Sequence, residues 1–354
     1  MFRYLKAIVA AKRLLTLGGK MTGEIEVLDV RQDQGAEYFV LPYNADTKPD
    51  GIQSLFWDSR SGHDLVESLE IAENKTRKYR LIRSFGKQLK KGDKVWLSGW
   101  LGENPEDLGL VGVIEIALPN GTLAYFQEAG DNWVIHVHGR NASRAETLRN
   151  FKTINNLGFS QLSISFESDP LPAGLGSRRS KLGTTEWLEL EAVIRFAYQR
   201  GANKIILFGF SLGAMVTGEC LRRSSLGQSV AALILDSPLI DFEATLNLQA
   251  AKAGQSPRFG SYGLSLITSS RLFRFIGLGI ESIPNLVRPL GVPALVFYSQ
   301  TDGYVSMDRI PQLQALNPQS EFVHFPYGRH CRLYNQDPAL YDEKLTSFLT
   351  RFQI

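Results

Sequence analysis

The hydrophobic pattern of the first third of the chain is that of short strands. Between residues 24 and 100, apolar and β-branched runs alternate with turn residues, as they do in small β-rich units. These runs lie at 26–30, 38–41, 54–57, 79–82 and 95–100. The pattern predicts a β-rich attachment at 21–110, which follows a basic segment at 1–20 and precedes a larger unit at 111–354.

The pattern changes after Pro105. Two extended runs, 111–118 and 122–127, flank the pair Asn120-Gly121, which is a strong hairpin signal. Beyond the hairpin, runs of strand length alternate with helical patterns, and they lie at 133–137, 162–166, 205–208, 231–235, 294–298 and 322–325. This alternation predicts an α/β fold with a mostly parallel central sheet and helices on both faces. Ligands of such sheets bind at the carboxyl ends of the strands.

Composition adds few constraints. The 354 residues are 44% hydrophobic and 21% charged, with a formal charge of +3, which excludes a disordered chain, a collagen and a disulfide scaffold. Only Cys220 and Cys331 are present, so we expect no bridge framework and a reducing compartment. No histidine, cysteine or acidic cluster has metal-ligand spacing, and no glycine-rich phosphate loop precedes a helix. We therefore expect neither a metal nor a cofactor.

The basic segment at 1–20 carries the excess positive charge. It contains five basic and no acidic residues, whereas the rest of the chain has 34 basic and 36 acidic residues. Its apolar run is too short for a signal sequence or a spanning helix, so we expect a cytoplasmic protein. Packing of Phe2, Leu5 and Val9 on the body is favoured, and weak contact with an anionic membrane surface is the alternative.

A second basic stretch lies within the attachment. Residues 75–94 include nine basic residues and one acid, with Tyr79 and Phe85 between them. A solvated strand face explains these charges, and no recognition helix or RNA-binding signature accompanies them. We therefore expect no nucleic-acid partner.

Ser211 is the candidate nucleophile. It lies in Gly209-Phe-Ser-Leu-Gly213, which runs from a predicted strand directly into a helical pattern. Such a sharp turn needs small flanking residues, because side chains at 209 and 213 would collide with neighbouring backbone. The turn would project the serine hydroxyl above the edge of the sheet.

A serine hydroxyl needs an imidazole base within hydrogen-bond reach. His330 fits best, because it follows the last strand run in a loop that can return over Ser211. The other four histidines fit worse, since one lies in the attachment, two lie inside strand runs and one lies in a different loop: His63, His136, His324 and His138.

The imidazole in turn needs a carboxylate on its second nitrogen. Asp302 follows the strand run 294–298 and is favoured for this role. Asp236, at the end of the run 231–235, is the alternative, and it also fits a turn cap beside Ser237-Pro238.

Attack on a carbonyl creates an oxyanion that needs two N–H donors. The main-chain amide of Leu212, at the start of the predicted helix, is one candidate. We assign the second to the amide of Arg140 in the loop after the run 133–137, where His138 begins the motif and Gly139 lets the chain pass close to the nucleophile. The Arg140 and Arg144 side chains are expected to be solvated, with contact to an acidic group of the substrate as the alternative, and Ser143 to Glu146 reads as a capping box.

The ordered series of motifs resembles the α/β-hydrolase superfamily, and more closely a set of actinobacterial α/β-hydrolases. The motifs are His138-Gly-Arg-Asn-Ala-Ser-Arg144, Gly183-Thr-Thr-Glu-Trp187, Leu207-Phe-Gly-Phe-Ser-Leu-Gly213, Leu235-Asp-Ser-Pro238 and the segment from His330 to Tyr341. The resemblance extends from about Tyr79 to residue 354. It implies a hydrolase with a triad in the order Ser211, Asp302, His330. Two positions depart from the pattern, namely Ala214, where many relatives have a second glycine, and the sequence Arg329-His330-Cys331.

Hydrolases of this fold place a helical cap between the strand runs 231–235 and 294–298, and we expect one at about 238–290. Helical patterns at 242–253 and 264–280 flank a Gly/Ser-rich stretch at 254–263. Five apolar residues fit either the wall of an acyl pocket or the core of a helix: Leu266, Leu272, Phe273, Phe275 and Ile276.

The leading hypothesis is a carboxylesterase-like serine hydrolase that acts on a small-molecule ester or thioester. A serine peptidase or an acyltransferase that uses the same triad is the first alternative, although the attachment is too short for the β-propeller of prolyl-oligopeptidase relatives. A non-catalytic binding module on a hydrolase fold is the second alternative.

Overall fold

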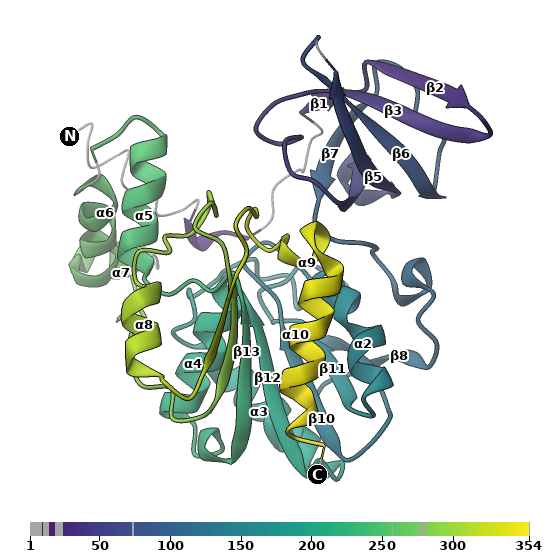
Figure 1. Ribbon diagram of the computed structural model, residues 1–354. Helices are drawn as coiled ribbons and strands as arrows, with labels where there is room; N and C mark the ends of the chain where they lie inside the picture. The colour runs from purple at the N-terminus through teal and green to yellow at the C-terminus, as the bar shows by residue number, and fades with distance from the viewer. Residues whose placement is uncertain are drawn as a thin grey trace.

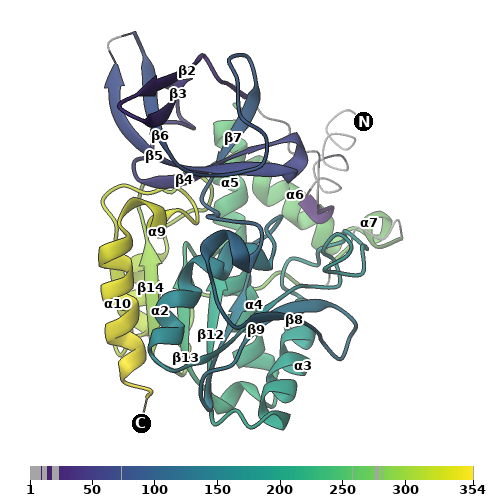
Figure 2. The same ribbon diagram turned by 90° about the vertical axis from the view of Figure 1, so that its right-hand side faces the viewer.

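The computed structural model describes residues 9, 14–17, 24–72, 74–256, 258–275, 279–280 and 282–353. Its strands form two separate sheets, and Figures 1 and 2 show one above the other. The first has seven strands, in the order β1 (Ile25–Glu26), β7 (Lys94–Ser98), β4 (Ile52–Trp57), β5 (Gly62–Ala72), β6 (Thr76–Phe85), β3 (Ala36–Pro42) and β2 (Asp29–Asp33). Every pairing in this seven-stranded sheet is antiparallel.

Strand β5 is the element of this sheet that the hydrophobic pattern does not predict. Its eleven residues include His63 and Asp64, which are polar yet only 2% and 1% exposed. His63 packs between the rings of Phe56 and Phe85 at centroid distances of 4.9 and 4.4 Å. Buried polar side chains hide the apolar alternation by which a strand is recognised.

The second sheet has eight strands and carries the candidate site. Its order is β15 (Glu321–His324), β14 (Ala294–Tyr298), β13 (Val230–Asp236), β12 (Lys204–Phe210), β10 (Asn132–Val137), β11 (Ser160–Ile164), β9 (Leu123–Gln127) and β8 (Val113–Ala117). The pairings from β15 to β11 are parallel, whereas β9 pairs antiparallel with both β11 and β8. The predicted hairpin around Asn120-Gly121 joins β8 to β9 and is confirmed.

Helices cover both faces of the eight-stranded sheet, and the α/β content agrees with the prediction. One face packs against α3 (Glu186–Gln199), α4 (Leu212–Arg223) and α8 (Ile310–Leu316). The other packs against α2 (Phe151–Asn156) and α10 (Pro338–Thr350), with the short α9 (Leu333–Gln336) before α10. The described residues also form the 3-10 turns η1 (Asp58–Arg60), η2 (Pro105–Leu108), η3 (Arg144–Asn150) and η4 (Gly227–Ser229). Both faces of the central strands are thereby buried, which explains their continuous apolar runs.

Between β13 and β14, where we expect the cap, the described residues form α5 (Phe242–Lys252), α6 (Arg258–Ser269) and α7 (Arg271–Phe275). The first agrees with the predicted pattern, but the second begins within the Gly/Ser-rich stretch rather than at residue 264. Gly260 explains this, because a Cβ there would lie 2.6 Å from the Asn247 nitrogen, so a glycine lets α6 approach α5 closely. Of the five apolar residues, Phe273 is buried, Phe275 is 88% exposed, and Ile276 lies outside the described residues.

The described part of the N-terminal segment packs on the body. Leu15 and Leu17 are buried, and the Leu17 N–H donates to the Arg178 carbonyl oxygen at 2.7 Å. Val9 is 46% exposed, while Phe2 and Leu5 lie outside the described residues. Across the described ranges, no helix combines the length and apolarity that a bilayer crossing requires.

The basic stretch at 75–94 forms β6 and the approach to β7, and several of its charges have partners. Arg77 is buried and donates to the carbonyl oxygens of Thr47 and Pro49, both at 3.0 Å. Lys78 lies 3.9 Å above the Tyr38 ring. These contacts fit the interpretation as a strand face, and the absence of a nucleic-acid partner stays a prediction.

Candidate active site

Ser211 lies at the sharp turn between β12 and α4. Its backbone has φ +51° and ψ −113°, a conformation that is strained for a residue with a side chain. The two flanking glycines are required by space: a Cβ at Gly209 would lie 2.6 Å from Ala214 backbone atoms, and one at Gly213 would lie 2.0 Å from the Val137 carbonyl oxygen. The turn therefore has the geometry of a nucleophile elbow.

The structure brings Ser211, His330 and Asp302 together, although they lie on three separate loops. His330 Nε2 is 2.7 Å from Ser211 Oγ, and His330 Nδ1 is 2.8 Å from Asp302 Oδ2. The second Asp302 oxygen accepts the main-chain N–H groups of Tyr304 and Val305, at 2.8 and 3.1 Å. These contacts orient the carboxylate toward the imidazole and leave the other ring nitrogen facing the serine.

The surroundings of His330 favour its charged form. Burial alone would lower the pKa of the imidazole, but the charge and the hydrogen bond of Asp302 outweigh burial and raise the pKa above its usual value. The ring of Tyr304 stacks on the imidazole at a centroid distance of 5.1 Å. A base that holds a proton this readily suits the removal of a hydroxyl proton during attack.

The loop after β10 passes directly beside Ser211. A Cβ at Gly139 would lie 3.2 Å from the Ser211 Cβ, so glycine permits this approach. The Gly139 N–H donates to Glu146 Oε2 at 3.2 Å, and the Gly139 carbonyl oxygen accepts from the Ala142 N–H at 3.2 Å. Leu212 opens α4, where the first amides lack intrahelical acceptors.

His138 fixes this loop through contacts of both of its ring nitrogens. Its Nδ1 lies 2.8 Å from the Gly139 carbonyl oxygen, and its Nε2 lies 2.8 Å from Asp169 Oδ2. Burial disfavours a charged His138, but the Asp169 carboxylate outweighs burial and raises the pKa of His138 to about 9. His138 is therefore a buried cation at neutral pH, a role that its motif position alone did not reveal.

Two side chains differ from the sequence predictions. Arg140 is half-buried: its Nε donates to the Leu14 carbonyl oxygen at 2.9 Å and its Nη2 to that of Thr16 at 3.2 Å. Arg144 is 6% exposed, because it pairs with Glu115 and lies 4.0 Å above the Tyr125 ring. The prediction of solvation was wrong for Arg144, and Arg140 has hydrogen-bond partners that it did not include, since neither partner segment is adjacent in sequence.

The predicted capping box is half present. The Ser143 hydroxyl accepts the Ala145 N–H at 3.3 Å, but the Glu146 carboxylate accepts from Gly139 instead of returning to Ser143. The first turns of this segment are 3-10. Glu146 is thus a site-shaping residue that sequence reasoning took for a helix cap.

Asp236, the alternative acid, faces away from His330. Its Oδ2 accepts the Tyr341 hydroxyl at 2.8 Å and lies 3.4 Å from Arg149 Nη2, and its Oδ1 accepts the Ser237 hydroxyl at 2.9 Å. All of these groups are buried. The structure gives Asp236 a structural network and leaves the second nitrogen of His330 to Asp302.

The remaining histidines contact other side chains of the fold rather than Ser211. His136 is fully buried in β10, where its Nε2 lies 3.1 Å from Gln161 Oε1, and burial lowers its pKa to about 3. Burial also lowers the pKa of His63. His324 lies at the end of β15 beside the Tyr298 ring. Within the described ranges, no three histidine, cysteine or acidic side chains gather where they could hold a metal ion, and both cysteines are buried and free.

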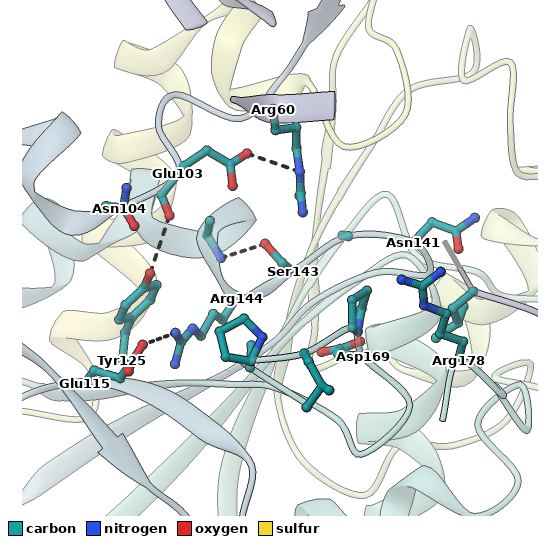
Figure 3. Close-up of a pocket in the computed structure, with 17 residues that line it drawn as sticks. Arg60, Glu103, Asn104, Glu115, Tyr125, Asn141, Ser143, Arg144, Asp169 and Arg178 are labelled. Carbon is teal, nitrogen blue, oxygen red and sulfur yellow. Dashed lines mark hydrogen bonds and ion pairs between the residues drawn. The ribbon is translucent and has the colours of Figure 1, made fainter. Parts of the chain in front are cut away.

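A cavity of about 640 Å³ adjoins the loop after β10 (Figure 3). Asn141 and Ser143 line it, as do Arg60 and Glu103 from the region of the seven-stranded sheet and of the link that follows it. Arg60 and Glu103 form an ion pair at 3.6 Å, and burial raises the pKa of Glu103 to about 7. The lining residues do not include Ser211, Asp302 or His330, so the cavity lies beyond the loop rather than over the triad.

Comparison with known proteins gives a match in structure only. No protein-family model matches the chain, and no curated protein sequence matches it. Three crystal forms of the esterase Pf2001 from Pyrococcus furiosus are similar in structure, with TM-scores of 0.53, 0.53 and 0.52 and identities of 19, 20 and 19%. The alignments cover 71% of this chain and 96, 94 and 94% of the esterase.

At this level of identity the likeness shows the fold. The chain has the fold of these esterases, which supports the α/β-hydrolase fold that the sequence motifs imply. The closer resemblance to actinobacterial hydrolases stays a prediction.

Proposed function

We propose that the protein is a serine hydrolase that cleaves a carboxylic ester or thioester through an acyl-enzyme on Ser211. The observation that carries this proposal is the alignment of Ser211 Oγ, His330 and Asp302, with contacts of 2.7 and 2.8 Å across the two imidazole nitrogens. The order of contacts matches the division of labour of a triad, in which the carboxylate orients the base and the base activates the hydroxyl.

In the first step, Ser211 Oγ attacks the carbonyl carbon and its proton passes to His330 Nε2. Asp302 stabilises the imidazolium through Nδ1–H. The amides of Leu212 and Arg140 donate to the oxyanion, and removing one such donor costs about 10²- to 10³-fold in other enzymes. When the tetrahedral intermediate collapses, His330 returns the proton to the leaving alcohol or thiol.

In the second step, water attacks the acyl-enzyme. His330 Nε2 takes a proton from the water, the oxyanion forms again, and collapse releases the acid as Ser211 regains its proton. His138 and Glu146 hold the Gly139 turn on both sides throughout, so neither donates a proton to the substrate. The chemistry requires no group beyond this chain and water.

The assignment of esters and thioesters as the substrate class rests on the fold and on the site together. The structurally similar Pf2001 is an esterase, which supports this class. The assembled triad also counts against a purely non-catalytic binding module, because such a module has no need of these three contacts.

The test is hydrolysis of p-nitrophenyl esters from acetyl to palmitoyl by the wild type and by Ser211→Ala. We expect a rate that falls at least about 10³-fold in the variant. A fluorophosphonate should label the wild type on Ser211, as peptide mapping would locate. Labelling that persists in Ser211→Ala, or an ester rate independent of Ser211, would contradict the proposal.

A further inference from the structure

The loop that carries His330 is bound by the seven-stranded sheet. Arg332, two residues after the base, donates from Nη1 to Gln53 Oε1 at 3.1 Å and from Nη2 to the Leu97 carbonyl oxygen at 2.6 Å. Gln53 belongs to β4 and Leu97 to β7, which are neighbours in that sheet. Arg332 therefore joins two strands of one sheet to the loop beside the other.

Asn335 makes a second connection. Its Nδ2 donates to the carbonyl oxygens of Ile52 and Gly99, at 2.7 and 3.0 Å. The backbones are also in close contact, because a Cβ at Gly51 would lie 1.9 Å from the Asn335 carbonyl oxygen. A Cβ at Gly99 would lie 2.7 Å from Arg332 Cγ. Figures 1 and 2 show this junction, where α9 meets the underside of the sheet.

A third connection reaches the residue next to the base. Arg149 is buried beneath the loop and donates from Nη1 to the carbonyl oxygens of Gly99, at 3.3 Å, and Cys331, at 2.9 Å. The Cys331 N–H donates to the Ser237 hydroxyl at 3.0 Å, and Cys331 has φ +53°, which is unfavourable for a residue with a Cβ. The backbone at 331 is thus held in a strained conformation from both sides.

These contacts are hard to replace with water. The carboxylate of Asp46 pairs at the surface with Arg329, at 2.9 Å, whereas Arg332 donates to the uncharged oxygens of Gln53 and Leu97. Burial lowers the pKa of Arg332 to about 10. Arg332 is half-buried, so the loss of one of these acceptors leaves a donor that water satisfies only in part.

We propose that the seven-stranded sheet is a brace for the catalytic base, with Arg332 and Asn335 as positioning residues that hold the His330 loop in register with Ser211. This inference rests on the proposed function. Its physical basis is that a displacement of about 1 Å at reacting groups can cost about 10²-fold in rate. The sheet then contributes to catalysis without contacting the substrate.

The test is a double-mutant cycle between the sheet and the loop, with Gln53→Leu and Arg332→Met made singly and together. We expect each single variant to lower kcat by about tenfold or more with little change in KM, because alignment rather than binding is lost. The double variant should be no slower than the slower single variant, since each single variant already removes the contact between Gln53 and Arg332. Rates that multiply in the double variant, or singles equal to the wild type, would overturn the brace.

Two further measurements distinguish a misaligned His330 imidazole from an unfolded protein. Glu67→Gln removes an exposed ion pair with Arg80 in the same sheet, and it should keep wild-type kcat and melting temperature. In Gln53→Leu the acidic limb of the kcat/KM profile should move to lower pH, because a displaced imidazole loses the Asp302 contact that raises its pKa. Should Arg332→Met fail to fold, Gln53→Leu alone decides the matter.

Fluorophosphonate labelling distinguishes the two ways of failing. Wild-type protein that is not labelled on Ser211 would contradict the proposed function itself. Wild-type protein that is labelled, at a rate that Gln53→Leu and Arg332→Met both reproduce, would leave the hydrolase standing and overturn the brace. We expect labelling on Ser211 in all three proteins, with the variants slower by the same factor as in ester hydrolysis.

Discussion

Two histidine–aspartate pairs lie on either side of Ser211, and they have the same length but different chemistry. His330 and Asp302 are 2.8 Å apart, as are His138 and Asp169. The His330 side chain is 19% exposed, whereas that of His138 is 3% exposed. Both imidazoles have a raised pKa, and in both the carboxylate outweighs burial.

The third partner decides what each pair can do. The second nitrogen of His330 faces a hydroxyl, which can either accept or donate a hydrogen bond, at 2.7 Å. The second nitrogen of His138 faces the Gly139 carbonyl oxygen, which only accepts, at 2.8 Å. One pair can therefore exchange a proton with Ser211, and the other is locked as a cation that fixes a loop. A histidine–carboxylate pair is not by itself a sign of a catalytic base.

The largest expected effect is that of Asp302→Asn. The amide would donate to His330 Nδ1 and leave the hydrogen on Nε2, where it cannot accept the proton of Ser211. We expect kcat to fall by about 10³- to 10⁴-fold with the fold intact. Steady-state ester hydrolysis, together with near-UV circular dichroism, measures both. A variant that keeps a tenth of the wild-type kcat would contradict the assignment of Asp302.

Asp236→Asn tests whether another buried carboxylate could replace Asp302. The change leaves Arg149, which is buried, without the carboxylate that faces it. Breaking a buried ion pair costs about 3 to 5 kcal/mol in the free energy of unfolding. Urea unfolding should show this loss, while the folded enzyme keeps its kcat. A 10³-fold loss of kcat at unchanged stability would make Asp236 the acid.

Asp169→Asn is the matched change in the second pair. An asparagine can donate to a neutral His138, so the loop stays bound while the charge disappears. In the wild type, the pKa of His138 is about 9 when folded and near its ordinary 6.5 when unfolded. The stabilisation is therefore complete below about pH 6.5 and lost as pH rises through about 9, a change of about 3 kcal/mol.

The measurement is the free energy of unfolding of wild type and Asp169→Asn between about pH 6 and pH 9. The difference between the two proteins removes the contribution of other titrating groups, such as Glu103. We expect the difference in the free energy of unfolding between the two proteins to shrink as pH rises. A gap that stays constant across this range would show that His138 is not a cation in the folded protein.

The smallest expected effect concerns the wild type. It is the pH at which activity falls on the acidic side of the pH profile. His330 must be neutral to accept a proton, and Asp302 raises its pKa above the ordinary value of 6.5. Activity should therefore rise with pH through a pKa above 6.5 and fall as pH decreases below it. The pH dependence of kcat/KM on a short-chain ester measures this pKa. A limb below 6.5 would mean that burial outweighs Asp302.

The parts of the fold and of the candidate site that could be predicted have signals in the sequence close to the residues concerned. Ser211 and Asp302 follow apolar strand runs, and parallel strands place such ends at one edge, so their meeting followed from the alternation of elements. The elbow was predictable because its glycines flank the serine at fixed positions. Helix α5 begins at its predicted residue and ends one residue before its predicted end, with Asp241 as its N-cap and Gly254 shortly after its end.

The remaining features depend on contacts between distant segments. Glu146 has the spacing of a capping residue, and nothing nearby reveals that its carboxylate binds Gly139. Arg140 contacts carbonyl oxygens more than 120 residues away, so its side chain was taken for a solvated one. The contacts between the seven-stranded sheet and the His330 loop are even harder to predict, because the backbone carbonyls at 52, 97 and 99 carry no residue-specific signal in a sequence.

The distance along the chain between the brace and the base sets an order of events during synthesis. Arg332 follows its partner Leu97 by 235 residues, and Asn335 follows Ile52 by 283. Segments that emerge from the ribosome first can fold first, so the seven-stranded sheet and the Ser211 turn can be complete while the base is still untranslated. Under the proposed function, a nascent chain would thus carry Ser211 in its turn without a base to activate it, and hydrolysis would begin only after residues 329–335 pack against the folded sheet.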